Sequence, residues 1–192
     1  MNSSKSIGIR SFATHQKWRE WLEKNHSKSD GIWLRIFKKD SGKKTVTHDE
    51  ALDQALCFGW IDGQRNKHDD VSFLQKFTPR RARSIWSKRN QEKTAKLIKD
   101  GRMTSAGLAE IERAKKDGRW DRAYDSPKNM EVPADFLKEL KKNKKAYEFF
   151  ETLNKTNKFA IAFRLHSAKR PETRERRMKD FLARMERGEK LN

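Results

Sequence analysis

Several features are scarce in this sequence of 192 residues, and each absence removes a class of protein. The single cysteine, Cys57, cannot form an internal disulfide, so the fold does not depend on a disulfide framework. The N-terminal segment up to Trp18 lacks the run of roughly seven apolar residues that a secretory signal needs, and no segment is apolar enough to span a bilayer. We therefore expect a cytoplasmic protein without stable membrane insertion.

Metal and nucleotide motifs are also missing. The histidines show no pair at the i, i+4 spacing of a zinc-binding helix, and one cysteine cannot complete such a site. Gly42-Lys43 lacks the upstream glycine and the following Ser or Thr of a P-loop, and no dinucleotide fingerprint occurs. We expect no metal and no cofactor.

Positive charge is present in large excess. The chain has 46 Lys and Arg against 27 Asp and Glu, a net charge of +19. Residues 1–74 carry only +3 of it, and residues 75–192 carry +16. The densest segment, residues 75–99, holds nine basic side chains and one acidic side chain, Glu92. This excess favours a polyanionic partner, of which nucleic acid is the simplest.

Helix signals open the N-terminal part of the chain. Apolar residues at i, i+3 and i+4 after Thr14, a residue type suited to an N-cap, predict a helix ending near His26. Thr47 and Glu50 have the spacing of a capping box, which predicts a second helix through about Cys57.

Strand signals lie between and after these helices. Residues 32–37 alternate with a period of two and have bulky residues on both faces, which predicts a buried strand. Residues 60–65 and 71–77 predict two more strands, the second ended by Pro79. We therefore expect a small sheet of about three strands.

The remainder of the chain has helical spacing. Residues 88–99 and 105–116 predict helices that are closed by glycines, and three apolar stripes follow in residues 146–185. The sequence thus predicts an α+β fold with two parts: an α+β domain at residues 1–125 and a helical C-terminal module at residues 126–192.

Six segments carry a resemblance to a known family: GIWLRIFKK (31–39), EALDQALCFGWIDG (50–63), FTPRRARSIWSKRN (77–90), GRM (101–103), GRWDRAY (118–124) and AKRPETRERR (168–177). In this order they resemble the YdeI/OmpD-associated, or bacteriocin-protection, family from about Trp18 to Arg187. The resemblance implies a stress-protection role and supplies no catalytic residues.

Asp62 is the strongest candidate for an acid or base. It directly follows an apolar run, where partial desolvation can tune a carboxylate for proton transfer. The other interpretation is structural, because Asp62-Gly63 is a favoured turn dipeptide and the carboxylate can also form an ion pair.

Arginines and a helix start near Pro79 form a candidate anion site. Arg80 and Arg81 follow a rigid turn and can hold a phosphate or carboxylate, with Trp33 and Trp60 lining the same cleft. Downstream, a helix N-terminus at Ser87–Asn90 has free amides that favour an anion, although an ordinary N-cap gives the same pattern.

Two further groups complete the candidate binding residues. Trp86 lies among basic residues, as expected where bases stack on aromatic rings, but tryptophan more often fills a core. Arg174 and Arg177 share one face of a predicted helix, where local ion pairs with glutamates are the simpler interpretation.

The residues leave two functions open. The first is a non-enzymatic binding or protection protein that engages an anionic partner through a basic face. The second is an enzyme or small-molecule-binding protein, with Asp62 as acid or base and Arg80 or Arg81 as an anion clamp. The large excess of positive charge and the scarcity of catalytic motifs favour the first function.

Overall fold

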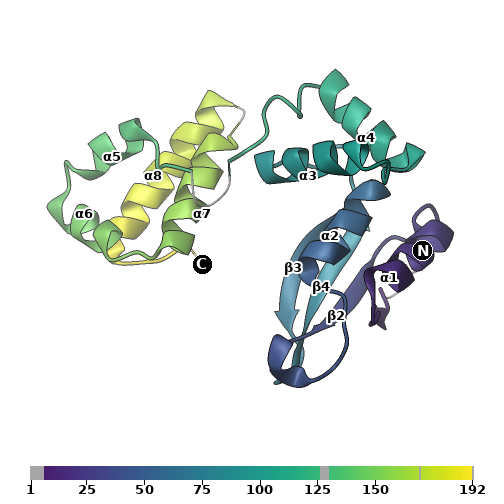
Figure 1. Cartoon of the computed structure of the whole chain (residues 1–192). Coiled ribbons are helices and arrows are strands. Elements are labelled where there is room, and N and C mark those ends of the chain that lie inside the picture. Colours follow the sequence, from purple (N-terminus) through teal and green to yellow (C-terminus); the bar gives the residue numbers. More distant parts are fainter. Residues whose placement is uncertain (1–6, 126–129, 169, 192) are drawn as a thin grey trace, which may run out of the picture. The chain divides into compact units, whose positions relative to one another are not determined.

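The computed structural model describes residues 7–125, 130–168 and 170–191 (Figure 1). The chain divides into two compact units, one ending at Ala123 and the other beginning at Tyr124. The boundary predicted after residue 125 falls on residues 126–129, which lie outside the described residues.

The N-terminal unit contains a mixed sheet of four strands in the order β1-β2-β4-β3. These are β1 (Ile9–Arg10), β2 (Ile32–Phe37), β3 (Trp60–Lys67) and β4 (Ser72–Pro79). The α+β class is confirmed, but the expectation of about three strands was wrong. The additional strand, β1, has two residues and pairs in parallel with β2, so it is too short to show an alternating pattern.

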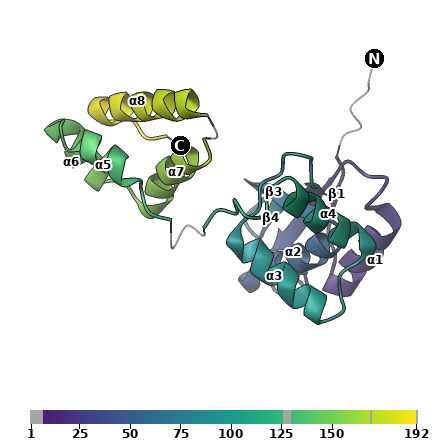
Figure 2. The same ribbon diagram turned by 90° about the horizontal axis from the view of Figure 1, so that it is seen from above.

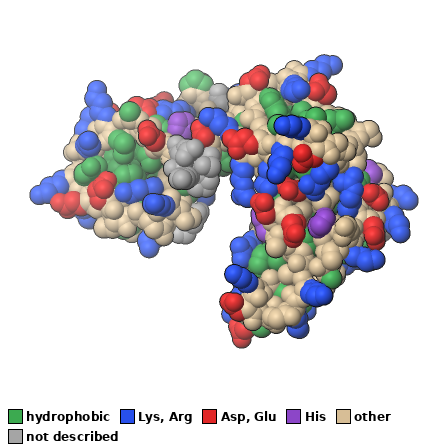
Figure 3. Space-filling view, viewed as in Figure 1, with side chains coloured by type: hydrophobic (Ala, Val, Ile, Leu, Met, Phe, Trp, Pro, Cys, Tyr) green, Lys and Arg blue, Asp and Glu red, His purple; other side chains and the backbone are tan. Residues whose placement is uncertain are grey.

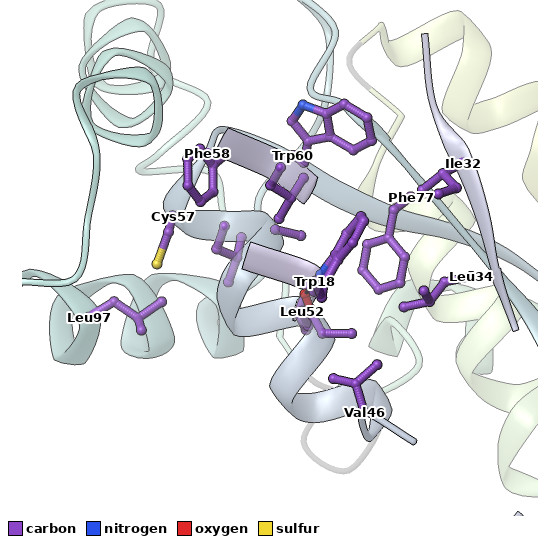
Figure 4. Close-up of a cluster of buried hydrophobic side chains, with 14 of the residues drawn as sticks. Trp18, Ile32, Leu34, Val46, Leu52, Cys57, Phe58, Trp60, Phe77 and Leu97 are labelled. Carbon is purple, nitrogen blue, oxygen red and sulfur yellow. Dashed lines mark hydrogen bonds between the residues drawn. The ribbon is translucent and has the colours of Figure 1, made fainter. Parts of the chain in front are cut away.

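One face of this sheet is buried under helices. Ile32 pairs with Phe77, and Leu34 with Gln75, so these side chains point to the same face. Helices α1 (His15–Asn25) and α2 (His48–Cys57) pack there and bring Trp18 and other buried side chains into one cluster (Figure 4).

The helix starts use the caps that the sequence predicts. The side chain of Thr14 accepts a hydrogen bond from the amide of Lys17, and Thr47 and Glu50 form a complete capping box. Two further helices, α3 (Lys88–Lys99) and α4 (Ser105–Lys116), have the predicted bounds. A short 3-10 helix, η1 (Lys39–Ser41), follows β2.

Helix α4 lies unusually close to the end of α2. A Cβ atom on Gly107 would come within 2.3 Å of the carbonyl oxygen of Cys57, so no larger residue fits there without a shift. The hydroxyl of Thr104 donates to the same carbonyl at 2.6 Å. Cys57 itself is fully buried, and burial raises the pKa of its thiol.

The C-terminal unit is helical in its described residues (Figure 2). Its helices are α5 (Ala134–Leu140), α6 (Lys144–Glu151), α7 (Lys155–His166) and α8 (Pro171–Arg187). They enclose a second hydrophobic cluster built around Phe136, Phe150, Ile161, Phe181 and Met185. None of the described helices of either unit is long and apolar enough to cross a membrane.

Candidate functional site

Asp62 lies on β3 opposite Phe77, on the face that the helices cover. Its carboxylate is 3.0 Å from Nε2 of His48, at the first turn of α2, and about 30% of each side chain is exposed (29% for Asp62 and 32% for His48). This pair links α2 to the sheet. Because 14 residues separate the two positions, no sequence spacing indicated His48 as the partner.

The chain does not reverse at Asp62-Gly63. Strand β3 continues to Lys67, with an irregularity in the register between Asp62 and Arg65. The buried side chain of Gln75 donates to the carbonyl oxygens of Gly63, at 2.9 Å, and of Gln64, at 3.3 Å. Of the two structural interpretations, the turn is absent, and the carboxylate has a side-chain partner, His48, at 3.0 Å.

Arg80 is buried, with 5% of its surface exposed. Nη1 of Arg80 donates to the carbonyl oxygen of Ile85 at 3.1 Å, and Cζ lies 3.6 Å from the centroid of the Trp86 ring. The backbone amide of Arg80 donates to the carbonyl oxygen of Gly59 at 2.9 Å. Arg80 thus holds the following loop through Ile85 and Trp86.

A second buried arginine, which the sequence did not single out, holds the same loop. Arg119 is 6% exposed, and its Nη1 donates to the carbonyl oxygen of Ser84 at 2.7 Å. Its Nε donates to Asp117 at 2.7–2.8 Å. A charged residue after a helix-ending glycine carried no sequence signal that it would be buried.

The start of α3 has an ordinary N-cap. Oγ of Ser87 accepts a hydrogen bond from the amide of Asn90 at 3.2 Å, and both residues are 8% exposed. Arg81, by contrast, has an exposed side chain before the helix, while its backbone amide donates to Oγ of Ser84 and its carbonyl oxygen accepts from the amide of Ser84, both at 2.9 Å.

The three candidate tryptophans lie in different environments. Trp60 and Trp86 are each 1% exposed and belong to the core cluster of the N-terminal unit. Nε1 of Trp60 donates to the carbonyl oxygen of His26 at 3.1 Å. Trp33 is partly exposed and belongs to neither hydrophobic cluster.

Arg174 and Arg177 form contacts within the C-terminal unit. Both guanidinium nitrogens of Arg174 donate to Asp135, at 2.6 and 2.9 Å, and these hydrogen bonds lower the pKa of that carboxyl group. Nη1 of Arg177 donates to the carbonyl oxygen of Arg164. The predicted segment of residues 168–177 includes Lys169, which lies outside the described residues.

Around α3, exposed cations gather on the surface (Figure 3). Among the described residues, no carboxylate forms an ion pair with four of them, which we call the basic stripe: Arg81, Arg83, Lys96 and Lys99. Their neighbours Arg89 and Lys93 differ, because both bind Asp49, at 2.7 and 2.9 Å. The hydrogen bond from Lys93 lowers the pKa of Asp49.

An open groove of about 520 Å³ lies elsewhere on the N-terminal unit. Its charged lining is mixed and includes Arg19, Arg102, Glu50 and Asp53, but none of the candidate residues. Within the described parts of the chain, no group of three or more His, Cys, Asp or Glu side chains is arranged to hold a metal ion.

Two family models match the sequence. Residues 129–188 match the family described as "Bacteriocin-protection, YdeI or OmpD-Associated", which confirms the predicted resemblance for the C-terminal part. Residues 10–110 match a different model, "Domain of unknown function (DUF8412)", so most of the motifs in the N-terminal part fall under that family. No curated protein and no solved structure matches the chain.

These two matches follow the division of the fold. One lies within the unit that ends at Ala123, and the other covers most of the unit that begins at Tyr124. The chain belongs to the DUF8412 family through residues 10–110, and at residues 129–188 it carries a domain of the bacteriocin-protection, YdeI or OmpD-associated family.

Proposed function

We propose that the protein is a non-enzymatic binding protein whose N-terminal unit engages a polyanion, with nucleic acid as the partner, through the basic stripe. The observation that carries this proposal is the exposure of four cations along the loop before α3 and on α3 itself, without carboxylate partners among the described residues. Cations free of internal pairs are available to replace the counterions of a phosphate backbone.

The other candidate residues support binding less directly. Arg80 and Arg119 fix the loop that presents Arg81 and Arg83, since each donates to a carbonyl oxygen within it. A loop held at two points loses less conformational freedom when a partner binds. Stress protection, the role implied by the C-terminal family, and a cytoplasmic location are parts of the same proposal.

The salt dependence of binding tests this function. If four phosphates are contacted on a duplex, the affinity should fall about 150-fold between 50 and 200 mM salt, because the logarithmic slope is about −0.9 per contact. A variant with all four stripe residues changed to alanine should lose most of this slope. A matched variant, in which four exposed cations of the C-terminal unit are changed to alanine (Lys145, Lys155, Arg170 and Arg176), should keep it.

Two results would count against the proposal. One is that nucleic acid is not retained at low salt, and the other is a slope that stays the same in the stripe variant. Thermal unfolding of both variants serves as the control, because exposed cations contribute little to stability.

The alternative is an enzyme or small-molecule-binding protein. One observation favours it, the contact between Asp62 and His48, because a carboxylate that orients an imidazole is a common arrangement for proton transfer. In that case Arg81 would have to supply the anion clamp alone, since Arg80 is buried against Trp86.

A further inference from the structure

The sheet of the N-terminal unit has a second face, opposite the one that α1 and α2 cover. Trp33 pairs with Lys76, and Arg35 with Leu74, so these four side chains share that face. Trp33 and Phe37 are partly exposed and belong to neither hydrophobic cluster, whereas Leu74, which also belongs to neither, is buried with 9% of its surface exposed. We call this surface the outer face.

Cations lie against the aromatic rings of the outer face. Nζ of Lys76 is 5.6 Å from the centroid of the Trp33 ring. Cζ of Arg35 is 4.6 Å and Nζ of Lys43 is 5.0 Å from the centroid of Phe37. Aromatic rings beside cations suit a partner that has both flat rings and negative charge.

Arg35 is fixed in place as well as charged. Its Nε donates to Oγ of Ser72 at 3.0 Å, and its Nη2 donates to Asp69 at 2.6 Å. With Phe37 beneath it, the guanidinium forms an oriented plane. Bases of single-stranded nucleic acid stack on such arginine planes as well as on aromatic rings.

The spacing along β2 indicates which form of nucleic acid fits. Trp33 and Arg35 are two residues apart on one face, which corresponds to about 7 Å. Neighbouring bases of a duplex are only about 3.4 Å apart along the axis. Two platforms at twice that distance match a strand whose bases are separated, not a stacked duplex.

We infer that the outer face binds single-stranded nucleic acid, with bases on the Trp33 ring and the Arg35 plane and with Lys76 against the backbone. This inference rests on the proposed function, and it adds a second surface and the form of the nucleic acid. Because Arg35 is paired with Asp69, it serves as a stacking plane, and Lys76 supplies the positive charge for the backbone.

The test measures the binding of a fluorescently labelled oligonucleotide, on the order of 12 nucleotides long, as a single strand and as a duplex. Trp33→Ala should weaken single-strand binding about 10-fold, because stacking of one base is lost, and should leave duplex binding unchanged. Trp33→Phe should restore most of the affinity. Lys76→Ala should reduce the logarithmic salt slope for the single strand by about 0.7.

Ile98→Ala is the matched control, since Ile98 is an apolar residue on α3 with 47% of its surface exposed. It should leave both affinities unchanged, and thermal unfolding shows whether each variant is folded. Single-strand binding that is the same in Trp33→Ala as in the unchanged protein would overturn the inference while leaving the proposed function intact. Failure of the unchanged protein to bind either form would overturn both.

An anionic lipid surface is the competing partner for an aromatic and basic face. Binding to vesicles that contain phosphatidylserine distinguishes a lipid partner from nucleic acid. Loss of vesicle binding in Trp33→Ala, together with unchanged oligonucleotide binding, would assign the outer face to lipid and refute the inference.

Discussion

In the C-terminal unit Arg174 and Arg184 lie against carboxylates of their own unit, whereas in the N-terminal unit the four residues of the basic stripe have no such partners among the described residues. Arg174 binds Asp135 between α8 and α5, and Arg184 binds Asp180 within α8. Arg81 and Arg83 stand exposed before α3. Both units are basic: residues 1–123 have 28 basic and 16 acidic side chains, and residues 124–192 have 18 and 11.

This difference shows that a charge count does not locate a binding surface. The ion pair of Arg174 with Asp135 joins α8 to α5, so this cation is less available to an external anion. In the N-terminal unit, buried Arg80 and Arg119 hold the loop before α3, and other cations remain at the surface. Substitutions in one unit can therefore be tested for effects on that unit alone.

The largest expected effect concerns the two cores. All six tryptophans lie in residues 1–123, so tryptophan fluorescence reports on the N-terminal unit alone. Phe136→Ala removes a fully buried ring of the C-terminal unit and should cost it about 3–5 kcal/mol of unfolding free energy. Circular dichroism should detect this loss, while the fluorescence transition stays in place. An equal shift of both signals would show that the units unfold as one.

The next effect is specific to the N-terminal unit. Gly107→Ala places a methyl group against the carbonyl of Cys57 and should cost about 1–3 kcal/mol, measured by tryptophan fluorescence in denaturant. Gly63→Ala is the matched control, because its new Cβ would have only ordinary contacts, at 3.8 Å or more. Similar losses for both variants would contradict the close contact of α4 with α2.

A smaller effect distinguishes structure from chemistry at Asp62. A double-mutant cycle of Asp62→Ala and His48→Ala should give a coupling energy of about 0.5–1 kcal/mol, because the pair is partly exposed. Nucleic-acid affinity should not change in either single variant. If the losses of unfolding free energy in the two single variants add up to the loss in the double variant, the pair does not stabilise the packing of α2 on the sheet.

The smallest effect tests the ion pair of the C-terminal unit. Hydrogen bonds from Arg174 hold the pKa of Asp135 below its ordinary value of 3.8, so the pair stabilises the fold above that pH and its contribution disappears as the pH falls through the folded-state pKa. Asp135→Asn should therefore lose about 0.2–1 kcal/mol at neutral pH. Circular dichroism should show the variant and the unchanged protein converging in acid. A difference that is independent of pH would exclude this explanation.

The sequence predicted the elements with strong local signals. Helices α3 and α4 were predicted with their bounds, because Ser87 caps the start of α3 and glycines, Gly101 and Gly118, follow the ends of both helices. Strand β1 was missed because two residues show no period, and its pairing with β2 depends on contacts distant in sequence.

The candidate residues were harder to place, because their partners are far apart in the chain. Neither the contact of Asp62 with His48 nor the burial of Arg80 against Trp86 follows from local spacing. The pairing of Trp33 with Lys76 becomes visible only once the register of β2 and β4 is known. Composition favours a polyanionic partner, which stays a prediction, and tertiary contacts decide which cations are exposed.

The burial of Cys57 under α4 has a practical consequence. Because the only thiol of the chain is covered, a thiol reagent can modify it only when the N-terminal unit opens around it. When closing is fast, the rate of modification in native buffer measures the equilibrium between closed and open forms. The protein thus contains its own chemical probe of local opening, which needs neither denaturant nor an added label site.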